Sequence, residues 1–202
     1  GHLLGEVEKD DLVLTSGAEP GDSIILTKGI FIEGTSIIAR ERADALAAHN
    51  FSEDYIEKCK QFLYDPGISV YKEAMLANKQ FKIKSMHDPT EGGLYCGIAE
   101  MAMASHCGVL IDESKIKIFE ESQAVSEIFK LNPLNTIASG SLLIAIDKCN
   151  ASALISLLQN NDIEAFEIGE FTPKKNGLKV KTNKNRIKAL KYSEIDEITK
   201  IF

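Results

Sequence analysis

Two short apolar runs constrain the fold more than any other feature of the sequence. Residues 23–27 (SIILT) and 141–146 (SLLIAI) are almost continuously apolar, and turn-forming glycines lie next to both. Runs of this length are typical of strands buried inside a sheet, whereas buried helices are longer. The sequence therefore predicts two buried strands, of which residues 141–146 form a central one.

Helical patterns and shorter strand patterns alternate with these runs. Helical segments are expected at 34–50, 52–63, 70–77, 94–105, 120–131 and 151–159. Short strands are expected at 12–14, 81–85, 109–111, 163–171 and 178–181. Because this order is mixed, neither strictly βαβ nor segregated, we predict one α+β domain over residues 1–202, a mixed β-sheet covered by helices. Gly1 and His2 are interpreted as the remnant of an expression tag.

Charge and cysteine usage narrow the class of protein. The formal net charge of −7 argues against nucleic acid or an anionic membrane as a partner. No apolar run approaches the length that spans a bilayer. The four cysteines form no CxxC pair and the four histidines do not cluster with them, so we expect no metal site. Buried free thiols in a reducing cytoplasm fit this pattern.

Residues 85–94 (SMHDPTEGGL) carry the signals of a helix start. Asp88 fits an N-cap, Pro89 fits the first helical position, and Glu91 fits the third position of a capping box. His87 adjoins Asp88 in sequence, which does not orient one side chain on the other, and no Ser–His–Asp triad is indicated. The sequence identifies no catalytic residue.

Gly92 and Gly93 are not explained by a cap, because each glycine inside a helix costs about 1 kcal/mol relative to alanine. Close packing of the helix start would offset this cost. Close approach of a phosphate to the backbone N–H groups of the first turn would offset it equally. Both alternatives stay open from the residues, and the charge of Glu91 would repel an anion unless Mg²⁺ bridged the two or the side chain turned back to cap.

Two further stretches have a similar order of strand, glycine turn and small polar residues. After the first apolar run come Lys28 and Gly29, and then Gly34 and Thr35 open a predicted helix. Lys28 could supply a positive charge, but the GxxxxGK[ST] order of a phosphate-binding P-loop is absent. Residues 136–141 (TIASGS) precede the second apolar run. Each stretch is also compatible with an ordinary connecting loop.

Four segments, taken in order, resemble a known family. They are GDSIILTKGIFIEGTSIIARE (21–41), ISVYKEAMLA (68–77), MHDPTEGGL (86–94) and TIASGSLLIAI (136–146). Together they resemble the C-terminal domain of the aminoimidazole ribonucleotide (AIR) synthetase-related superfamily, and within it the HypE-like hydrogenase maturation factors. The resemblance covers roughly residues 5–172.

The resemblance implies a function as one half of a larger enzyme. Family members have an N-terminal domain that carries most ligands of ATP and Mg²⁺ and forms a homodimer. Their C-terminal domain closes the cleft with glycine-rich loops, and the chemistry is ATP-dependent activation of an oxygen atom. This chain is therefore expected to lack the N-terminal ATP-binding domain, to be inactive alone and to hold no nucleotide tightly. The implied phosphate- or nucleotide-binding residues are Asp88, Thr90, Glu91, Gly92, Gly93, Lys28, Gly29, Gly34 and Thr35.

Two departures from the HypE pattern favour an alternative. HypE-like proteins usually have arginine in place of Glu91, and they carry a reactive cysteine at the extreme C-terminus, whereas the last cysteine here is Cys149. If Phe202 is the native end, the HypE reaction in its known form is not expected. The alternative is a non-catalytic interaction domain that docks a hydrogenase maturation partner.

Overall fold

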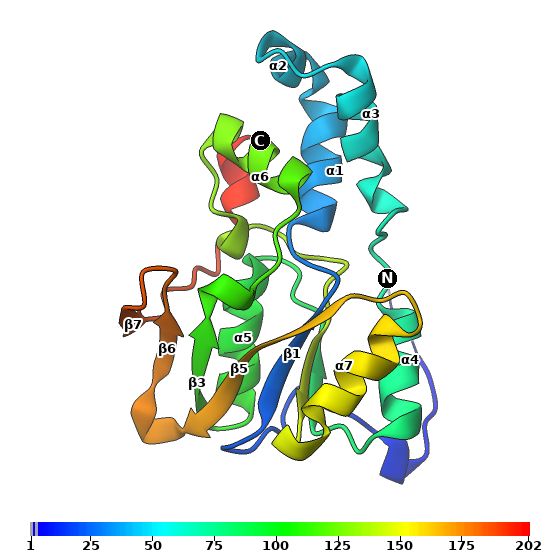
Figure 1. Cartoon of the computed structure of the whole chain (residues 1–202), viewed down its shortest axis with the longest axis vertical. Helices are drawn as coiled ribbons and strands as arrows, with labels where there is room; N and C mark the ends of the chain where they lie inside the picture. The colour runs from blue at the N-terminus through cyan, green and yellow to red at the C-terminus, as the bar shows by residue number, and fades with distance from the viewer. Residues whose placement is uncertain (1, 3) are drawn as a thin grey trace.

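A mixed β-sheet forms the centre of the molecule in the computed structural model, which describes residues 2 and 4–202 (Figure 1). Gly1 of the expected tag remnant lies outside the described residues. The strands are β1 (Ser23–Thr27), β2 (Ser85–His87), β3 (Cys107–Asp112), β4 (Leu143–Ile146), β5 (Ala165–Pro173), β6 (Leu178–Lys181) and β7 (Ile187–Ala189). Their order is β2-β4-β1-β5-β3-β6-β7, and β3 and β6 pair in parallel whereas all other neighbours are antiparallel. The predicted α+β class with a mixed sheet is confirmed.

Helices cover both faces of this sheet and one of its ends. They are α1 (Ile32–Glu41), α2 (Ala43–Ala48), α3 (Glu53–Lys60), α4 (Tyr71–Gln80), α5 (Gly93–Ala104), α6 (Glu120–Phe129) and α7 (Ala151–Gln159). Side chains alternate along β1, so that Ile24 and Leu26 pack in the core that contains α5, whereas Ile25 packs in the core that contains α4 and α7. This double coverage explains why the buried strands read as continuous apolar runs.

A third cluster lies beyond the end of β1, where α1, α2, α3 and α6 pack together (Figure 1). Phe31, Ile38, Leu46 and Val125 are fully buried in this cluster. The chain passes directly from β1 into α1, so the loop after β1 joins the sheet to the helical cluster. No helix among the described residues is long and apolar enough to cross a membrane.

Several predicted element boundaries are wrong. The helix expected at 34–50 is divided into α1 and α2 at Arg42, whose φ of −131° is not helical. Residues 12–14 do not form a β-strand. The strand expected at 81–85 is displaced along the chain: β2 begins only at Ser85. Ser52 does cap α3, since its side chain accepts a hydrogen bond from the N–H of Tyr55 at 3.2 Å.

Candidate functional site

The loops that contain the three predicted stretches meet at one edge of the sheet. β4 is antiparallel to both β1 and β2, so β4 begins where the other two strands end. The Oγ of Ser141 donates to the carbonyl of Gly29 at 2.5 Å, and the N–H of Ala138 donates to the carbonyl of Thr90 at 3.3 Å. Segments that are far apart in sequence therefore form a single loop cluster.

The glycine loop enters α5 without a side-chain cap. The helix begins at Gly93, and its N-cap residue, Gly92, has no side chain with which to cap it. Gly92 and Gly93 have φ of 77° and 69°, a left-handed conformation that glycine adopts without strain. The predicted capping box of Asp88 and Glu91 is wrong, because this left-handed turn delays the helix beyond Pro89.

Both glycines are also sites of close packing. A Cβ on Gly93 would lie 2.6 Å from the carbonyl oxygen and 2.7 Å from the nitrogen of Thr136. A Cβ on Gly92 would lie 2.7 Å from the carbonyl oxygen of Ser193 and 2.7 Å from the Cβ of Cys96. Close packing therefore accounts for both glycines, while a contact with phosphate stays a prediction.

The backbone N–H of Gly92 already has an anionic partner. It donates to Oδ2 of Asp196 at 2.7 Å, and Oδ1 of the same side chain accepts from the N–H of Ile198 at 2.8 Å. Asp196 is only 7% exposed. Asp196 was not among the residues predicted from the sequence, and no local signal marks it, because 104 positions separate it from Gly92.

Lys28 is held inside the protein rather than at its surface. Its Nζ lies 2.7 Å from the carbonyl oxygen of Ser69, 3.2 Å from that of Gly67 and 3.0 Å from Oε1 of Glu73. Glu73 is 2% exposed, so this is a buried ion pair that ties the loop after β1 to α4. Glu73 lies in a segment that carried the family resemblance, but its pairing could not be read from the sequence.

The other predicted residues of this loop support its shape. A Cβ on Gly29 would lie 2.8 Å from the ring of Phe119, and one on Gly34 would lie 2.2 Å from the ring of Phe31. Thr35 is fully buried, and its Oγ1 donates to the carbonyl of Phe31 at 2.6 Å. These three residues pack the loop against its neighbours, and their contact with a nucleotide stays a prediction.

The exposed part of the loop cluster is acidic. Asp88, Thr90 and Glu91 are all exposed. Protein atoms around the Asp88 carboxyl partly desolvate it and raise its pKa, and the charges of Glu33 and Glu73 act in the same direction. Within the described residues no three His, Cys, Asp or Glu side chains are grouped closely enough to hold a metal ion.

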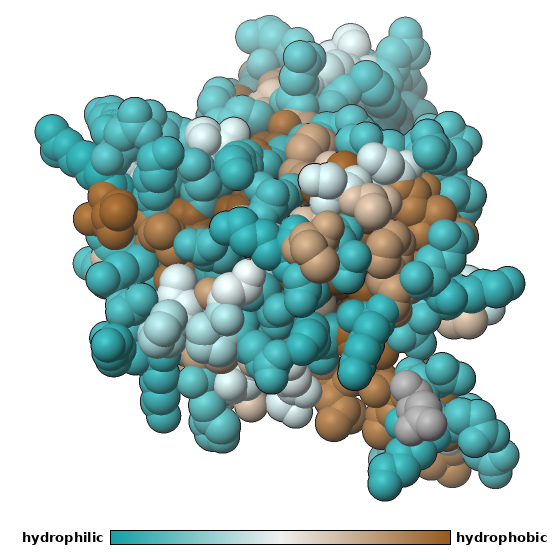
Figure 2. All heavy atoms as spheres, turned by 60° about the horizontal axis from the view of Figure 1, so that its bottom comes forward, coloured by the Kyte–Doolittle hydropathy of each residue, from teal (hydrophilic) through white to brown (hydrophobic). Residues whose placement is uncertain are grey.

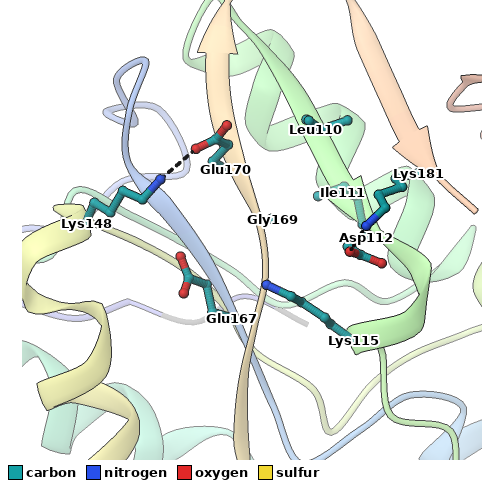
Figure 3. Close-up of a pocket in the computed structure, with 9 residues that line it drawn as sticks. All are labelled: Leu110, Ile111, Asp112, Lys115, Lys148, Glu167, Gly169, Glu170 and Lys181. Atoms are coloured by element: carbon teal, nitrogen blue, oxygen red, sulfur yellow. Dashed lines mark hydrogen bonds and ion pairs between the residues drawn. The ribbon is translucent and has the colours of Figure 1, made fainter. Parts of the chain in front are cut away.

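A second concave region lies on the sheet across β3 and β5 (Figure 3). Lys148 pairs with Glu170 at 3.0 Å, and in Figure 3 the Lys115 side chain points across Gly169. Three lysines and three carboxylates line the hollow, so their formal charges sum to zero. These residues are Asp112, Lys115, Lys148, Glu167, Glu170 and Lys181. None of the predicted site residues lines it.

Three loops converge at one end of a mixed, helix-covered sheet, and the chain is an α+β domain. Residues 19–181 match the family model described as AIR synthase related protein, C-terminal domain. The chain therefore belongs to this family, as the four sequence segments predicted.

Two curated relatives illustrate the match. A Methanocaldococcus jannaschii protein named for hydrogenase expression and formation is 28% identical over 182 residues, which cover 89% of this chain and 50% of the relative. Carbamoyl dehydratase HypE of Cupriavidus necator is 26% identical over 178 residues, which cover 83% of this chain and 45% of the relative. The chain thus spans about half the length of the curated relatives it matches.

Solved structures of HypE share the fold. Escherichia coli HypE superposes with a TM-score of 0.75 at 20% identity, over 94% of this chain and 55% of that chain. A HypE in complex with ATP superposes with a TM-score of 0.68 at 18% identity, over 98% of this chain and 58% of that chain. A chain of a HypE–HypF complex superposes with a TM-score of 0.63 at 19% identity, over 90% of this chain and 56% of that chain. At these identities the similarity establishes the fold.

Proposed function

We propose that this chain is the C-terminal domain of a HypE-like, ATP-dependent enzyme related to hydrogenase maturation factors, and that its glycine loops contact the phosphates of ATP. The observation that carries the proposal is the convergence of three separate loops at one edge of the sheet. The HypE that was solved with ATP shares this fold, which supports nucleotide as the ligand. Preorganised backbone N–H donors of such loops stabilise charge that develops during phosphoryl transfer.

The proposed contacts divide by exposure. Asp88, Thr90 and Glu91 are exposed and face an incoming ligand. Lys28 and Thr35 are buried and fix the shape of the loop after β1. Carboxylate oxygens are ligands that Mg²⁺ prefers, so the chemistry of Asp88 and Glu91 fits a magnesium ion that accompanies the phosphates. When bound, this ion would offset the repulsion between the acidic loop and the nucleotide.

The whole protein is proposed to contain an N-terminal ATP-binding domain, to form a homodimer through that domain and to act in the cytoplasm. Apolar side chains exposed before β1 support a further domain packed beside this segment. Leu4 is 94% exposed and Val7 is 58% exposed, while Leu12 and Leu14 are each 52% exposed. Figure 2 shows that hydrophobic side chains reach the surface in patches on a largely hydrophilic face.

The test is an Asp88→Asn variant of the complete gene product. It removes one of the two proposed carboxylates with almost no change in size, and the matched control is Asp44→Asn at an exposed position on α2. We expect Asp88→Asn to lower ATP turnover by about tenfold or more, as loss of a group that acts at developing charge does. Equal turnover in both variants and the wild type would refute the proposal. Alanine at Gly92 or Gly93 is a poorer test, because it would disturb the packing described above.

An interaction domain without catalytic activity is the second candidate. The anionic Asp196 on the Gly92 N–H and the exposed Glu91 both disfavour phosphate at this loop. The shared fold with the HypE of a HypE–HypF complex supports a maturation protein as the partner. This candidate predicts that a purified maturation protein binds the chain with the same affinity with and without Mg-ATP, by calorimetry.

A further inference from the structure

Residues 193–202, which we name the strap, lie directly over the glycine loop. The Asp196 carboxylate accepts the N–H of Gly92 at 2.7 Å inside the protein. The carbonyl oxygen of Ser193 approaches so closely that a Cβ on Gly92 would lie 2.7 Å away. The strap therefore covers the N-terminus of α5 with both a backbone and a negatively charged group.

The strap is held elsewhere by a few contacts. Arg42 donates to the carbonyl of Ile201 at 2.7 Å and lies 4.6 Å from the ring centroid of Phe202. Glu197 accepts from the N–H of Asn132 at 2.8 Å. Figure 1 shows the strap, in red, beside α6.

Local structure in the strap is slight. It contains one 3₁₀ turn, Glu197–Lys200, and pairs with no strand. Ile195 is 72% exposed and Phe202 is 58% exposed, whereas Asp196 is buried. Ile198 and Ile201 of the strap pack, partly buried, against the helical cluster. A segment that joins no sheet and whose other apolar side chains are exposed opens more readily than the core to which it is attached.

We propose that the strap is a displaceable autoinhibitory segment. The inference rests on the proposed function, in which the glycine loop receives a phosphate. A phosphoryl oxygen and the Asp196 carboxylate would compete for the same N–H of Gly92, and their negative charges would repel each other at that distance. The docked strap and a phosphate on this loop therefore exclude each other, so nucleotide binding must release the strap.

The experiment measures Mg-ATP affinity of the complete gene product by calorimetry. Asp196→Ala removes the competing carboxylate, and the matched control Glu194→Ala removes an equal charge from an exposed position of the same strap. Arg42→Ala is a second variant, which loosens the far end of the strap without touching Gly92. We expect Asp196→Ala and Arg42→Ala to bind Mg-ATP about fivefold to 150-fold more tightly than the wild type, the range of a typical coupling, and Glu194→Ala to be unchanged.

Hydrogen exchange of the same samples reports on the strap itself. Saturating Mg-ATP should increase amide exchange in residues 193–202 of the wild type. If all variants bind Mg-ATP equally and strap exchange is unchanged, the strap is a permanent part of the fold and the inference is wrong, while the proposed function stands. If neither the wild type nor Asp196→Ala binds Mg-ATP, both the inference and the proposed function are wrong.

Discussion

Gly93→Ala provides the sharpest test of the loop cluster. The substitution forces a residue with a Cβ into a φ of 69°, which costs about 1–2 kcal/mol. It also places that Cβ 2.6 and 2.7 Å from the backbone oxygen and nitrogen of Thr136, and relieving such overpacking costs a further ~1–3 kcal/mol. We therefore expect the free energy of unfolding to fall by about 2–5 kcal/mol in total.

Gly177→Ala separates the two contributions. Gly177 has nearly the same φ, 68°, but its ψ of −172° lies in a region that glycine almost alone adopts, and nothing lies within 4 Å of its Cβ position. Alanine also reduces the entropy of the unfolded chain equally at both positions, so this effect cancels in the comparison. Gly177→Ala should lose only a conformational penalty, of about 1–3 kcal/mol for its backbone region, with no overpacking.

Urea unfolding measured by far-ultraviolet circular dichroism suits this chain, which contains no tryptophan. The variants should have equal m-values, so that the midpoints report stability directly. If Gly93→Ala loses no more than the conformational penalty of about 1–2 kcal/mol, the Thr136 backbone is free to move and the loops are not tightly docked. Close packing would then fail as the explanation of Gly93.

Three further predictions test the surroundings of this cluster. Lys28→Met leaves Glu73 buried without its cation and should cost about 3–5 kcal/mol in urea unfolding, and Lys28→Met/Glu73→Gln should recover part of the loss. The pKa of Asp88 is raised in the folded protein, so ionisation of this carboxyl opposes folding. Asp88→Asn should therefore stabilise the protein at pH 7 and have no effect on stability below the ordinary carboxyl pKa of about 4. Urea titrations across that pH range would measure both effects. Burial raises the pKa of Cys59 to about 11, so iodoacetamide at pH 8 should alkylate the exposed Cys149 and leave Cys59 unmodified in the folded protein, as peptide masses would show.

The sheet was largely predictable because its strands carry a local signal. Residues 23–27 and 141–146 are apolar on both faces, and only a strand covered on both sides requires that pattern. The division of α1 from α2 carried no such signal, because neither glycine nor proline occurs there. Arg42 lies at that break, and its side chain is engaged by the carbonyl of Ile201, which lies 159 positions away.

The candidate site was predictable as a set of loops but not as a set of contacts. The sequence singled out Lys28 as a cation beside a glycine turn. Its partners are the carbonyl of Ser69 and the carboxylate of Glu73, which reach it only because α4 folds back onto the end of β1. Composition and spacing do not determine which distant group satisfies a buried charge, although a buried charge must be paired.

Gly92 shows why packing and ligand binding were inseparable from the sequence. Both explanations require a position without a side chain, and phosphate binding also requires a backbone N–H that faces the ligand. They were treated as alternatives. In the structure the backbone of Ser193 provides the close packing, and three residues later Asp196 provides an anion for the same N–H. One segment, residues 193–196, therefore meets both requirements at once. The same geometry that explains Gly92 as a packing residue therefore also identifies the group that a phosphate would have to displace.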